Sequence, residues 1–439
     1  MLDDESDTDA RRPTPVTRRR TERVRRGDRA ATAATSHGER SRQALLTAAE
    51  SRYREHGFQA TRLADITSDA GLTTGSLYRH FSGKDDVLAV LFEQYRTELD
   101  DALESVDSLA GACAAWIETS REHTGLLRSA QEALRPHQPH AERWATARDG
   151  WERRFATLLP QRLIGPSRTV AAAAIVDGLE YYTLAEAAGW FPPRSTDHVG
   201  EQVALLVRSG LYREPSRNES PSPSLPAGIT LDRTYFAWEV SDGHAVPNSA
   251  RGRRTWESIR TAAMEVFAEI GFRAATVADI AETADVSPAT VYRYFRDKED
   301  LLLNLLTATE RELVERRMYP LDSSGRHPVR AVYEGFIALH RDRAGVFLAW
   351  SELNMPGTEY ERAWIDMHEI LMSQMDKVFR KGKRNGLIAD EVDTRLMTEF
   401  YGAIHERSAY TRVALGRGLA VSDREVAEVI DEIFNGGLG

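Results

Sequence analysis

The sequence predicts an all-helical protein built from two similar halves, and three observations support this. Apolar residues recur at helical spacing through 40–213 and again from Arg251, with no alternation typical of a strand. A segment that begins at Gly57 recurs without a gap at Gly271, 214 residues later. A stretch rich in proline and serine, 214–226, separates the halves and has no residues to form a core.

Length and composition limit the compartment and the number of domains. A chain of 439 residues has room for about three domains of roughly 150 residues. Cys113 is the only cysteine, so no disulfide forms within the chain, and a core thiol in a reducing compartment is the simplest reading. The start is acidic, unlike a signal peptide, and no run approaches the roughly 18 apolar residues of a membrane span. We expect a cytoplasmic, nucleoid-associated protein that contacts no membrane.

The net charge of −10 is unevenly distributed. Residues 10–42 contain eleven arginines and only three acidic residues. Such an arm suits electrostatic contact with phosphate, but a solvated tail explains it equally well. Residues 1–38 lack apolar periodicity, so we expect them to be flexible.

The second copy of the repeat has the signals of two helices joined by a turn. Thr276 stands three residues before Asp279 in an arrangement like a capping box, which predicts a helix start. Asp285 makes the turn, since aspartate tolerates a left-handed backbone. Ser287 caps the next helix, with Pro288 at its first position. This copy therefore reads as a helix-turn-helix.

The first copy has the same plan with weaker signals. Gly71 takes the turn, and Thr73 or Thr74 caps the helix that follows. Arg62 stands where the second copy has Thr276, so the preceding helix either starts at Thr61 or is less well capped. Arg62 could instead reach DNA.

The helix after each turn is short and has two distinct faces. Leu77 and Phe81, like Val291 and Phe295, are expected in the core. The polar side chains on the other face are Thr73, Thr74, Ser76, Tyr78 and His80 in the first copy and Ser287, Thr290, Tyr292 and Tyr294 in the second. Short hydrogen-bonding groups near a helix N-terminus suit phosphates and base edges in a major groove.

Both copies resemble the N-terminal DNA-binding domain of TetR/AcrR-family transcriptional regulators, over about 41–92 and 255–306. The resemblance rests on Gly-Phe, Ala, Asp-Ile and Ala, followed by Tyr-Arg-x-Phe and Lys, which occur in both copies. It implies a double-stranded DNA operator as partner and all-helical regulatory domains after each copy.

The resemblance also implies roles for individual residues. Positions expected to hold the phosphate backbone are Tyr78, His80, Lys84, Tyr292, Tyr294 and Lys298. Positions expected at or near base edges are Thr73, Thr74, Ser76, Ser287, Pro288 and Thr290. Alternatives stay open: the two tyrosine rings simply pack, the lysines are ordinary solvated lysines, and Arg79 and Arg293 either reach phosphate or stay solvated. The recognition segments differ, Thr-Thr-Gly-Ser against Ser-Pro-Ala-Thr, which predicts an asymmetric or imperfectly palindromic operator.

In the resembling family two regulatory domains dimerise through a four-helix bundle of their last helices. The candidates here are 168–189 with 196–211, and 394–416 with 422–437. Because one chain carries both pairs, the bundle could form within the molecule and give a covalent pseudo-dimer, and further self-association stays open.

A small-molecule effector is expected inside the regulatory domains. The aromatic and sulfur-containing candidates are Trp116, Trp144 and Trp151 in the first half and Phe336, Phe347, Trp350, Trp364 and Met367 in the second. The alternative is that each is an ordinary core side chain.

The expected domains follow from the repeat and the resemblance. They are a disordered basic arm over 1–38, a first DNA-binding domain over 39–95, a first regulatory domain over 96–213, a linker over 214–250, a second DNA-binding domain over 251–308 and a second regulatory domain over 309–439.

The expected function is a ligand-responsive DNA-binding regulator, with repression as the family's common mode. An enzyme finds little support, because there is no Gly-rich phosphate loop, HExxH or paired CxxC, and we expect no catalytic residue, metal or cofactor. A second alternative is a single-headed or protein-partner module whose first motif has degenerated, since Arg52, His56 and Arg62 stand at apolar or capping positions.

Overall fold

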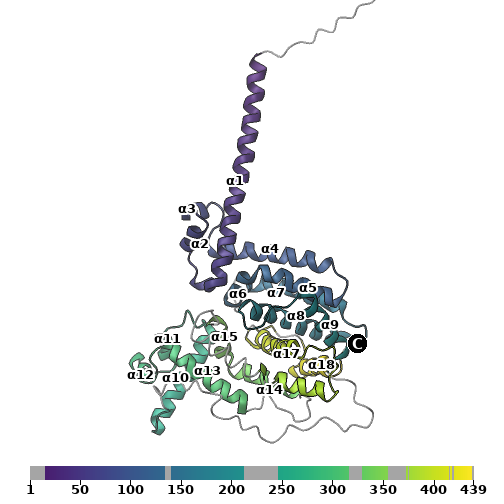
Figure 1. Ribbon diagram of the computed structural model, residues 1–439. Helices are drawn as coiled ribbons and strands as arrows, with labels where there is room; N and C mark the ends of the chain where they lie inside the picture. The colour runs from purple at the N-terminus through teal and green to yellow at the C-terminus, as the bar shows by residue number, and fades with distance from the viewer. Residues whose placement is uncertain are drawn as a thin grey trace, which may run out of the picture.

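A computed structural model describes residues 15–133, 140–211, 246–315, 329–353, 372–373, 375–414, 416–417 and 420–437 (Figure 1). Within these ranges the regular elements are helices, so the predicted fold class is confirmed. Most of the expected linker lies outside the described residues, as do the candidate ligand residues Trp364 and Met367.

The first half contains nine helices among its described residues. They are α1 (Pro15–Ala60), α2 (Leu63–Asp69), α3 (Thr74–Leu77), α4 (Lys84–Glu104), α5 (Leu109–Glu122), α6 (Thr124–Ala133), α7 (Ala141–Leu158), α8 (Gly165–Ala187) and α9 (Thr196–Ser209).

The second half repeats this order. Its described helices are α10 (Ala250–Glu269), α11 (Val277–Thr283), α12 (Pro288–Tyr292), α13 (Lys298–Glu315), α14 (Val329–Asp342), α15 (Ala344–Leu353), a helix over 375–384, α17 (Thr394–Ala409) with its π-helical continuation η3 (Tyr410–Ala414), and α18 (Asp423–Asn435). The match extends beyond the motif: α5 and α14 both have 14 residues, and α6 and α15 both have 10.

Helix α1 differs from the flexible arm that composition predicted over 1–38, because its backbone is helical from Pro15. Proline is tolerated in a first helical turn, and the arginines and alanines that follow are strong helix formers. The regular helix ends at Gly57, whose φ of 76° and ψ of 174° depart from helical geometry.

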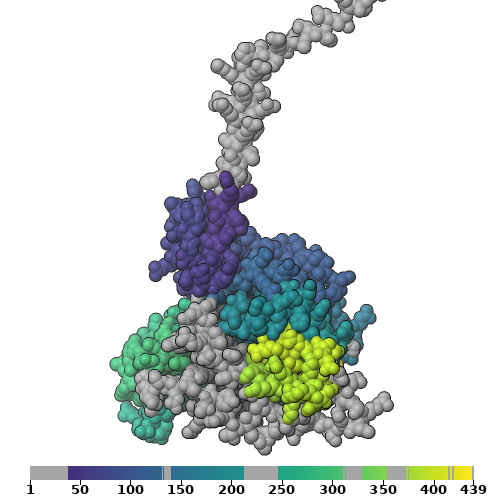
Figure 2. All heavy atoms as spheres, in the orientation of Figure 1, coloured from purple at the N-terminus to yellow at the C-terminus, as the bar shows by residue number. Residues whose placement is uncertain are grey.

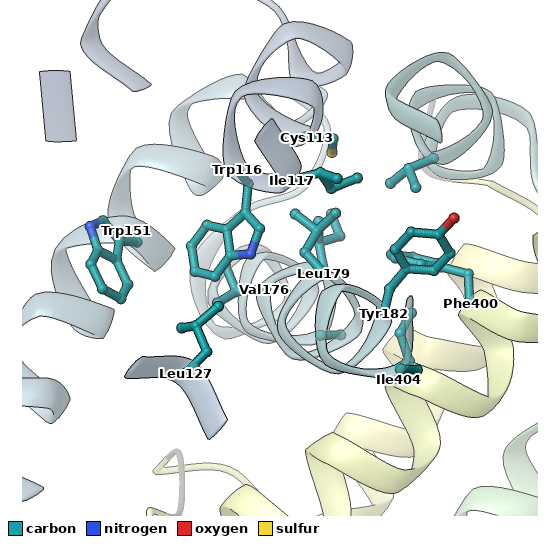
Figure 3. Packing of buried hydrophobic residues seen from close by; sticks show 14 of the residues in the cluster. Cys113, Trp116, Ile117, Leu127, Trp151, Val176, Leu179, Tyr182, Phe400 and Ile404 are labelled. Carbon is teal, nitrogen blue, oxygen red and sulfur yellow. The ribbon is translucent and has the colours of Figure 1, made fainter. Parts of the chain in front are cut away.

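The two halves share one hydrophobic core. The larger cluster runs from Leu45 of α1 through α8 and continues into Phe400 and Ile404 of α17. Figure 3 shows Trp116, Val176 and Leu179 of the first half in the same packed region as these two residues. A second cluster, which includes Phe267 and Phe295, is confined to the second three-helix domain, α13 and α15.

Helices α8, α9, α17 and α18 pack together, and these are the helices in which a bundle was expected. A Cβ added at Gly178 of α8 would lie 2.7 Å from Phe400 Cζ and 2.8 Å from Ile404 Cγ1, so the absence of a side chain at Gly178 makes room for these two side chains of α17. At the far end Leu211 N donates to Phe434 O at 2.7 Å. The packing of the halves is therefore continuous along these helices.

The two three-helix domains, α1–α3 and α10–α12, lie on the same side of the molecule, and the bundle lies on the other side (Figure 1). In the space-filling view the first of them protrudes from one end of the body that the regulatory helices form, and rests against it (Figure 2). Both short helices that follow the turns, α3 and α12, belong to this side.

None of the described helices has the length and apolar character needed to cross a membrane. In the same ranges no three His, Cys, Asp or Glu side chains gather as a metal site requires. Cys113 is fully buried, and burial raises the pKa of its thiol.

We expect Gly178→Ala to lower the free energy of unfolding by about 1–3 kcal/mol, because the added methyl meets Phe400 and Ile404 below van der Waals distance. The matched control is Gly150→Ala in α7, where the nearest atom lies 3.9 Å away. Alanine there should stabilise by up to about 1 kcal/mol, since glycine is a poor helix former. Urea denaturation measures both; equal effects would contradict the close approach of α8 and α17.

Candidate nucleic-acid interface

The second helix-turn-helix is capped as the sequence predicted. Asp279 N donates to Thr276 Oγ1 at 3.2 Å and Thr276 N donates to Asp279 Oδ2 at 2.8 Å, which completes a capping box. Asp285 makes the turn with a φ of 53°. Ser287 Oγ accepts from Thr290 N at 3.2 Å, with Pro288 in the first turn. Local sequence alone therefore fixes this motif.

The first helix-turn-helix reaches the same geometry with different residues. Thr73, not Thr74, is the cap, since its Oγ1 accepts from Ser76 N at 3.2 Å. Gly71 makes the turn with a φ of 64°. Arg62 forms no side-chain cap, but its N–H donates to Asp65 Oδ2 at 3.2 Å, and α2 begins at Leu63. Half of a capping box is enough to start this helix.

Tyr78 and Tyr292 close the short helices and are exposed. Their relative accessibilities are 58% and 55%, whereas Leu77 and Val291 beside them are buried. The alternative in which the two rings simply pack is therefore wrong. Each phenol is free to meet a partner on the outer surface of its domain.

Ser76 corrects one expectation. It is only 4% exposed, and its hydroxyl accepts from Arg79 Nη2 at 2.8 Å. The helix starts at Thr74, so the residue two positions later turns inward with Leu77. Ser76 is thus unsuited to a base edge and instead orients Arg79 on the outer surface. Thr73 and Thr74 remain exposed.

The equivalent surface of the second domain is built differently. Ser287 and Pro288 are exposed, while the half-buried Thr290 shares a hydrogen bond of 2.9 Å with Ser287 Oγ. The Arg293 guanidinium lies 5.0 Å from the ring centroid of Tyr294 and donates to its hydroxyl at 3.3 Å. In the first domain the position of Tyr294 is taken by the half-buried His80. The two surfaces therefore present different groups.

Lys84 and Lys298 point inward, against the expectation that they hold phosphate. Lys84 Nζ donates to the carbonyls of Phe58, Gln59 and Thr61 at 2.8, 3.3 and 3.3 Å. Lys298 Nζ repeats this with three carbonyls at 2.8, 3.2 and 2.9 Å. An ammonium has three donors, so these contacts use all of them. Partial burial lowers the pKa of both lysines.

A glutamate holds the same loop from the other side, and sequence reasoning missed it. Glu132 Oε2 accepts from Gln59 N at 2.7 Å, and Glu352 Oε2 accepts from Arg273 N at 2.8 Å. A signal was present: in each half a glutamate follows a glycine by seven residues, Gly125 and Gly345. We call the loops 57–61 and 271–275 the junction loops.

The two glycines bring α6 and α15 against the first helix of their halves. A Cβ at Gly125 would lie 2.1 Å from Glu50 O, and one at Gly345 would lie 1.9 Å from Met264 O. In the first half Glu50 Oε1 also accepts from Gly125 N at 2.6 Å. Burial raises the pKa of Glu50, although the backbone donors at the α6 N-terminus oppose this. Each three-helix domain is thereby fixed to a regulatory helix.

Arg52, which seemed misplaced on an apolar face, has a structural partner. Its Nε and Nη2 donate to the Asp69 carboxylate at 2.5 and 2.7 Å, which ties α1 to the end of α2. The equivalent residue in the second half, Val266, is buried in the core. The two halves thus join the same pair of helices by different chemistry.

The predicted ligand residues of the first half form a packed aromatic cluster. Trp116 and Trp151 meet edge to face at 5.4 Å, and Trp144 lies 6.1 Å from Trp151. Tyr95 contacts both Trp144 and Trp151, at 6.2 and 5.7 Å. Trp151 Nε1 donates to Asp100 Oδ1 at 2.8 Å. In this structure the rings fill the space between α4, α5 and α7.

In the second half Phe336 and Phe347 enclose His340. The imidazole lies 4.7 Å from the first ring and stacks on the second at 3.6 Å. Burial lowers the pKa of His340 to about 3, so the ring is neutral at pH 7. Trp350 packs instead against the core of the second three-helix domain. These candidates are therefore divided between two places.

The sequence profile described as bacterial regulatory proteins, tetR family, matches the chain twice, at 45–91 and 259–305. The chain is 26% identical over 158 residues to the fatty acid metabolism regulator protein of Bacillus subtilis, covering 35% of this chain and 81% of that protein. It is 33% identical over 87 residues to the HTH-type transcriptional repressor KstR2 of Mycobacterium tuberculosis, covering 18% of this chain and 44% of the repressor.

Solved structures similar to the chain carry related descriptions. The fatty acid degradation regulator FadR from Bacillus halodurans is 24% identical with a TM-score of 0.34, covering 42% of this chain and 95% of that one. A transcriptional regulator FadR from Bacillus subtilis in complex with stearoyl-CoA is 22% identical with a TM-score of 0.33, covering 41% and 98%.

We expect Lys84→Met and Lys298→Met each to lower the free energy of unfolding by about 1–3 kcal/mol in the absence of DNA, because three carbonyls of a junction loop lose a charged donor. Urea denaturation measures this. The control is Lys377→Met, an exposed lysine whose loss should change stability by less than about 0.5 kcal/mol. Variants with unchanged stability and weakened DNA binding would restore the phosphate role.

Proposed function

Since the chain belongs to the tetR family of bacterial regulatory proteins and carries two of its DNA-binding units in tandem, we propose that it is a ligand-responsive transcriptional regulator that binds one operator as a covalent pseudo-dimer. The observation that carries the proposal is geometric. Two capped helix-turn-helix domains, each with an exposed tyrosine, lie on one side of a body to which both halves contribute.

The DNA-facing groups on this proposal are those that the fold leaves exposed. In the first domain they are Thr73, Thr74 and Tyr78, with Arg79 held by Ser76. In the second they are Ser287, Pro288, Tyr292 and Arg293. Hydroxyls, guanidinium groups and helix N-termini are common phosphate donors, and side chains near the start of a recognition helix reach base edges.

Pairing within the chain would change how the operator is bound. A partner tethered by a linker is present at roughly millimolar effective concentration, so dissociation of the pair no longer limits DNA binding. The continuous core from α8 into α17 supports this arrangement. On this proposal DNA affinity does not depend on protein concentration through a dimerisation step.

The operator is proposed to have two unlike half-sites. We call the two three-helix domains, α1–α3 and α10–α12, the heads. The first head presents Thr73, Thr74 and the half-buried His80. The second presents Ser287, Pro288 and the paired Arg293 and Tyr294. Different groups at equivalent positions favour different bases. An asymmetric or imperfectly palindromic operator matches two such DNA-binding domains.

The single-headed alternative rested on three residues of the first domain, and each has a structural explanation. Arg52 pairs with Asp69. His56 is equivalent to Ile270, which is itself 44% exposed, so that position belongs to no core. Arg62 still precedes a regular helix. The first domain therefore retains a complete scaffold, and the alternative remains as an outcome of the test.

Effector control is proposed to act through the junction loops. A small molecule that enters a regulatory half must displace packed side chains near α4 and α6, and these helices hold the first junction loop through Lys84 and Glu132. A typical coupling of 1–3 kcal/mol would weaken operator binding roughly 5–150-fold. Repression relieved by the effector is the mode we propose.

The test of DNA binding begins with crosslinking the protein to genomic DNA and sequencing the recovered fragments. Tyr78→Phe and Tyr292→Phe remove only a hydroxyl from an exposed ring. Loss of one hydrogen bond to a charged phosphate predicts about a tenfold or greater fall in affinity for a recovered fragment from each substitution. Fluorescence anisotropy at fixed salt measures it.

The control is the thermal unfolding midpoint, which both tyrosine variants should keep because the hydroxyls lie at the surface. If Tyr78→Phe binds like the unaltered protein and Tyr292→Phe does not, the single-headed alternative is correct. If neither changes affinity, the proposed interface is wrong.

For the effector, a fatty acyl thioester is the first probe, chosen after the fatty acid metabolism regulator to which the chain is similar. Binding should open the cluster of Trp116, Trp144 and Trp151 and change tryptophan fluorescence over the concentrations that release DNA. Trp144→Ala should shift the releasing concentration at least about fivefold, the low end of typical coupling. Trp190→Phe, outside the cluster, is the control. Release without any fluorescence change would place the effector elsewhere.

A further inference from the structure

A buried ion cluster joins α7 and α8 of the first half to α17 of the second. Arg407 of α17 donates to both oxygens of Glu180 on α8, at 2.6 and 3.2 Å. Arg148 of α7 donates to the same carboxylate and to Asp177. Burial alone would raise the pKa of Glu180, but Arg407 and Arg148 together hold it below its usual value. The carboxylate is thus charged and paired across the two halves.

A second set of polar contacts, partly buried, crosses between the halves near the start of α9. Arg194 Nη1 donates to Glu399 Oε2 at 2.6 Å, and the Glu399 side chain is fully buried. Gln202 Nε2 donates to Glu391 O at 3.0 Å, and Asp393 N donates to Gln202 Oε1 at 2.8 Å. Each contact joins chemically different groups, one from each half.

The two halves are similar enough for equivalent positions to be identified, and these show which residues would meet if two equal halves paired. Ser195 and Ser422 both cap the last helix, and Gly210 and Gly437 lie against each other at its end. Each of these two pairs is separated by 227 residues, as are the ends of α8 and η3, Ala187 and Ala414. Applying the same spacing to α8 and α17 gives the equivalent positions.

With that alignment the charged residues have no like-charged equivalent in the other half. Glu180 is equivalent to Arg407 itself, and Glu399 to Ala172. Two first halves would therefore place Glu180 against a second Glu180 and leave Arg148 as the guanidinium shared by Glu180 and Asp177, and two second halves would place Arg407 against a second Arg407. Both arrangements break the buried ion pair between Glu180 and Arg407 and bring like charges together, which is strongly unfavourable.

One argument does not depend on the alignment. The only arginine on α8 is Arg168, and its guanidinium donates to the carbonyls of Leu163, Ala156, Leu159 and Pro160. A second copy of α8 would therefore offer Glu180 no available guanidinium.

Shape acts in the same direction as charge. A Cβ added at Gly178 would lie only 2.7 Å from Phe400 Cζ, so the Phe400 ring fills the space beside this glycine. On the same alignment the residue equivalent to Phe400 is Ala173. Two first halves would thus leave a void beside Gly178, and cavities in a packed core are costly.

We infer that this bundle selects its partner: it pairs a first half with a second half and rejects both pairs of equal halves. Specificity arises because the wrong pairs bring buried like charges together, in addition to the attraction between Glu180 and Arg407 in the right pair. The inference rests on the pseudo-dimer of the proposed function, but it concerns the pairing surface alone and is tested without DNA.

The experiment uses the full chain with a protease site inserted in the linker segment 214–226, cleaved after folding. Cleaved samples, one of them isotopically heavy, are mixed in urea raised until the labels exchange, and are then returned to buffer. Native mass spectrometry counts the pairs. We expect pairs of a first with a second half to exceed pairs of equal halves at least about tenfold.

Random pairing, with equal and unlike pairs at the same frequency, would overturn the inference, as would halves that no longer pair. The double variant Glu180→Gln with Arg407→Gln removes the cross-pair charge while Arg148 keeps Asp177 and Glu152. It should reduce the preference at least about threefold. The matched control, Glu93→Gln with Arg96→Gln, removes an exposed pair within α4 and should leave the preference unchanged. Equal effects of the two double variants would assign the selectivity to shape and refute the charge argument.

Selective pairing and DNA binding fail independently. A chain that pairs selectively but binds no operator refutes the proposed function and leaves this inference intact. A chain that binds an operator but re-pairs at random does the reverse.

Discussion

The contact of α8 with α17 is the constraint on which the arrangement of the molecule depends. It packs the side chains of Phe400 and Ile404 against Gly178, buries them, and closes an ion cluster around Glu180. Buried charges are costly unless fully paired, so this surface tolerates few relative positions of the two halves. Because the halves are fixed there, the positions of the two helix-turn-helix domains on the opposite side are fixed as well.

Rigid attachment of each head to its body extends this constraint to the surface. A junction loop receives three hydrogen bonds from a lysine at the start of α4 or α13 and one contact from a glutamate of α6 or α15. The hydrogen bonds reach backbone carbonyls and amides, and each ammonium also lies over the phenylalanine ring that both loops share, Phe58 at 4.4 Å and Phe272 at 4.7 Å. This explains how Phe58-Gln59 and Phe272-Arg273 can differ in sequence and still be held alike.

Much of the fold was predictable because its signals are local. Capping residues, turn residues with positive φ and the apolar positions of short helices depend on neighbours in sequence, and Thr276, Asp285 and Phe295 were placed correctly. Ser76, Lys84 and Lys298 were not, because their orientation depends on groups far along the chain or on where a helix begins. Arg52 was misread for the same reason, since its partner Asp69 lies 17 residues away. The ion cluster around Glu180 joins residues more than 200 apart, and nothing local signals it.

Duplication followed by divergence explains why the two halves are alike in some parts and differ in others. The parts that attach a head to its body are alike in both halves: the lysine, the glutamate and the close glycine. The parts that meet the other half, and those that face outward from the heads, are unlike. A protein that pairs equal chains must use one surface for both partners, so the charge that Arg407 supplies to Glu180 across the pair would have to come from the same helix as Glu180. The proposed pairing within one chain is free of that restriction, because there each half meets only the other. The same freedom applies to the recognition helices, and so unlike pairing surfaces and unlike reading heads are expected together.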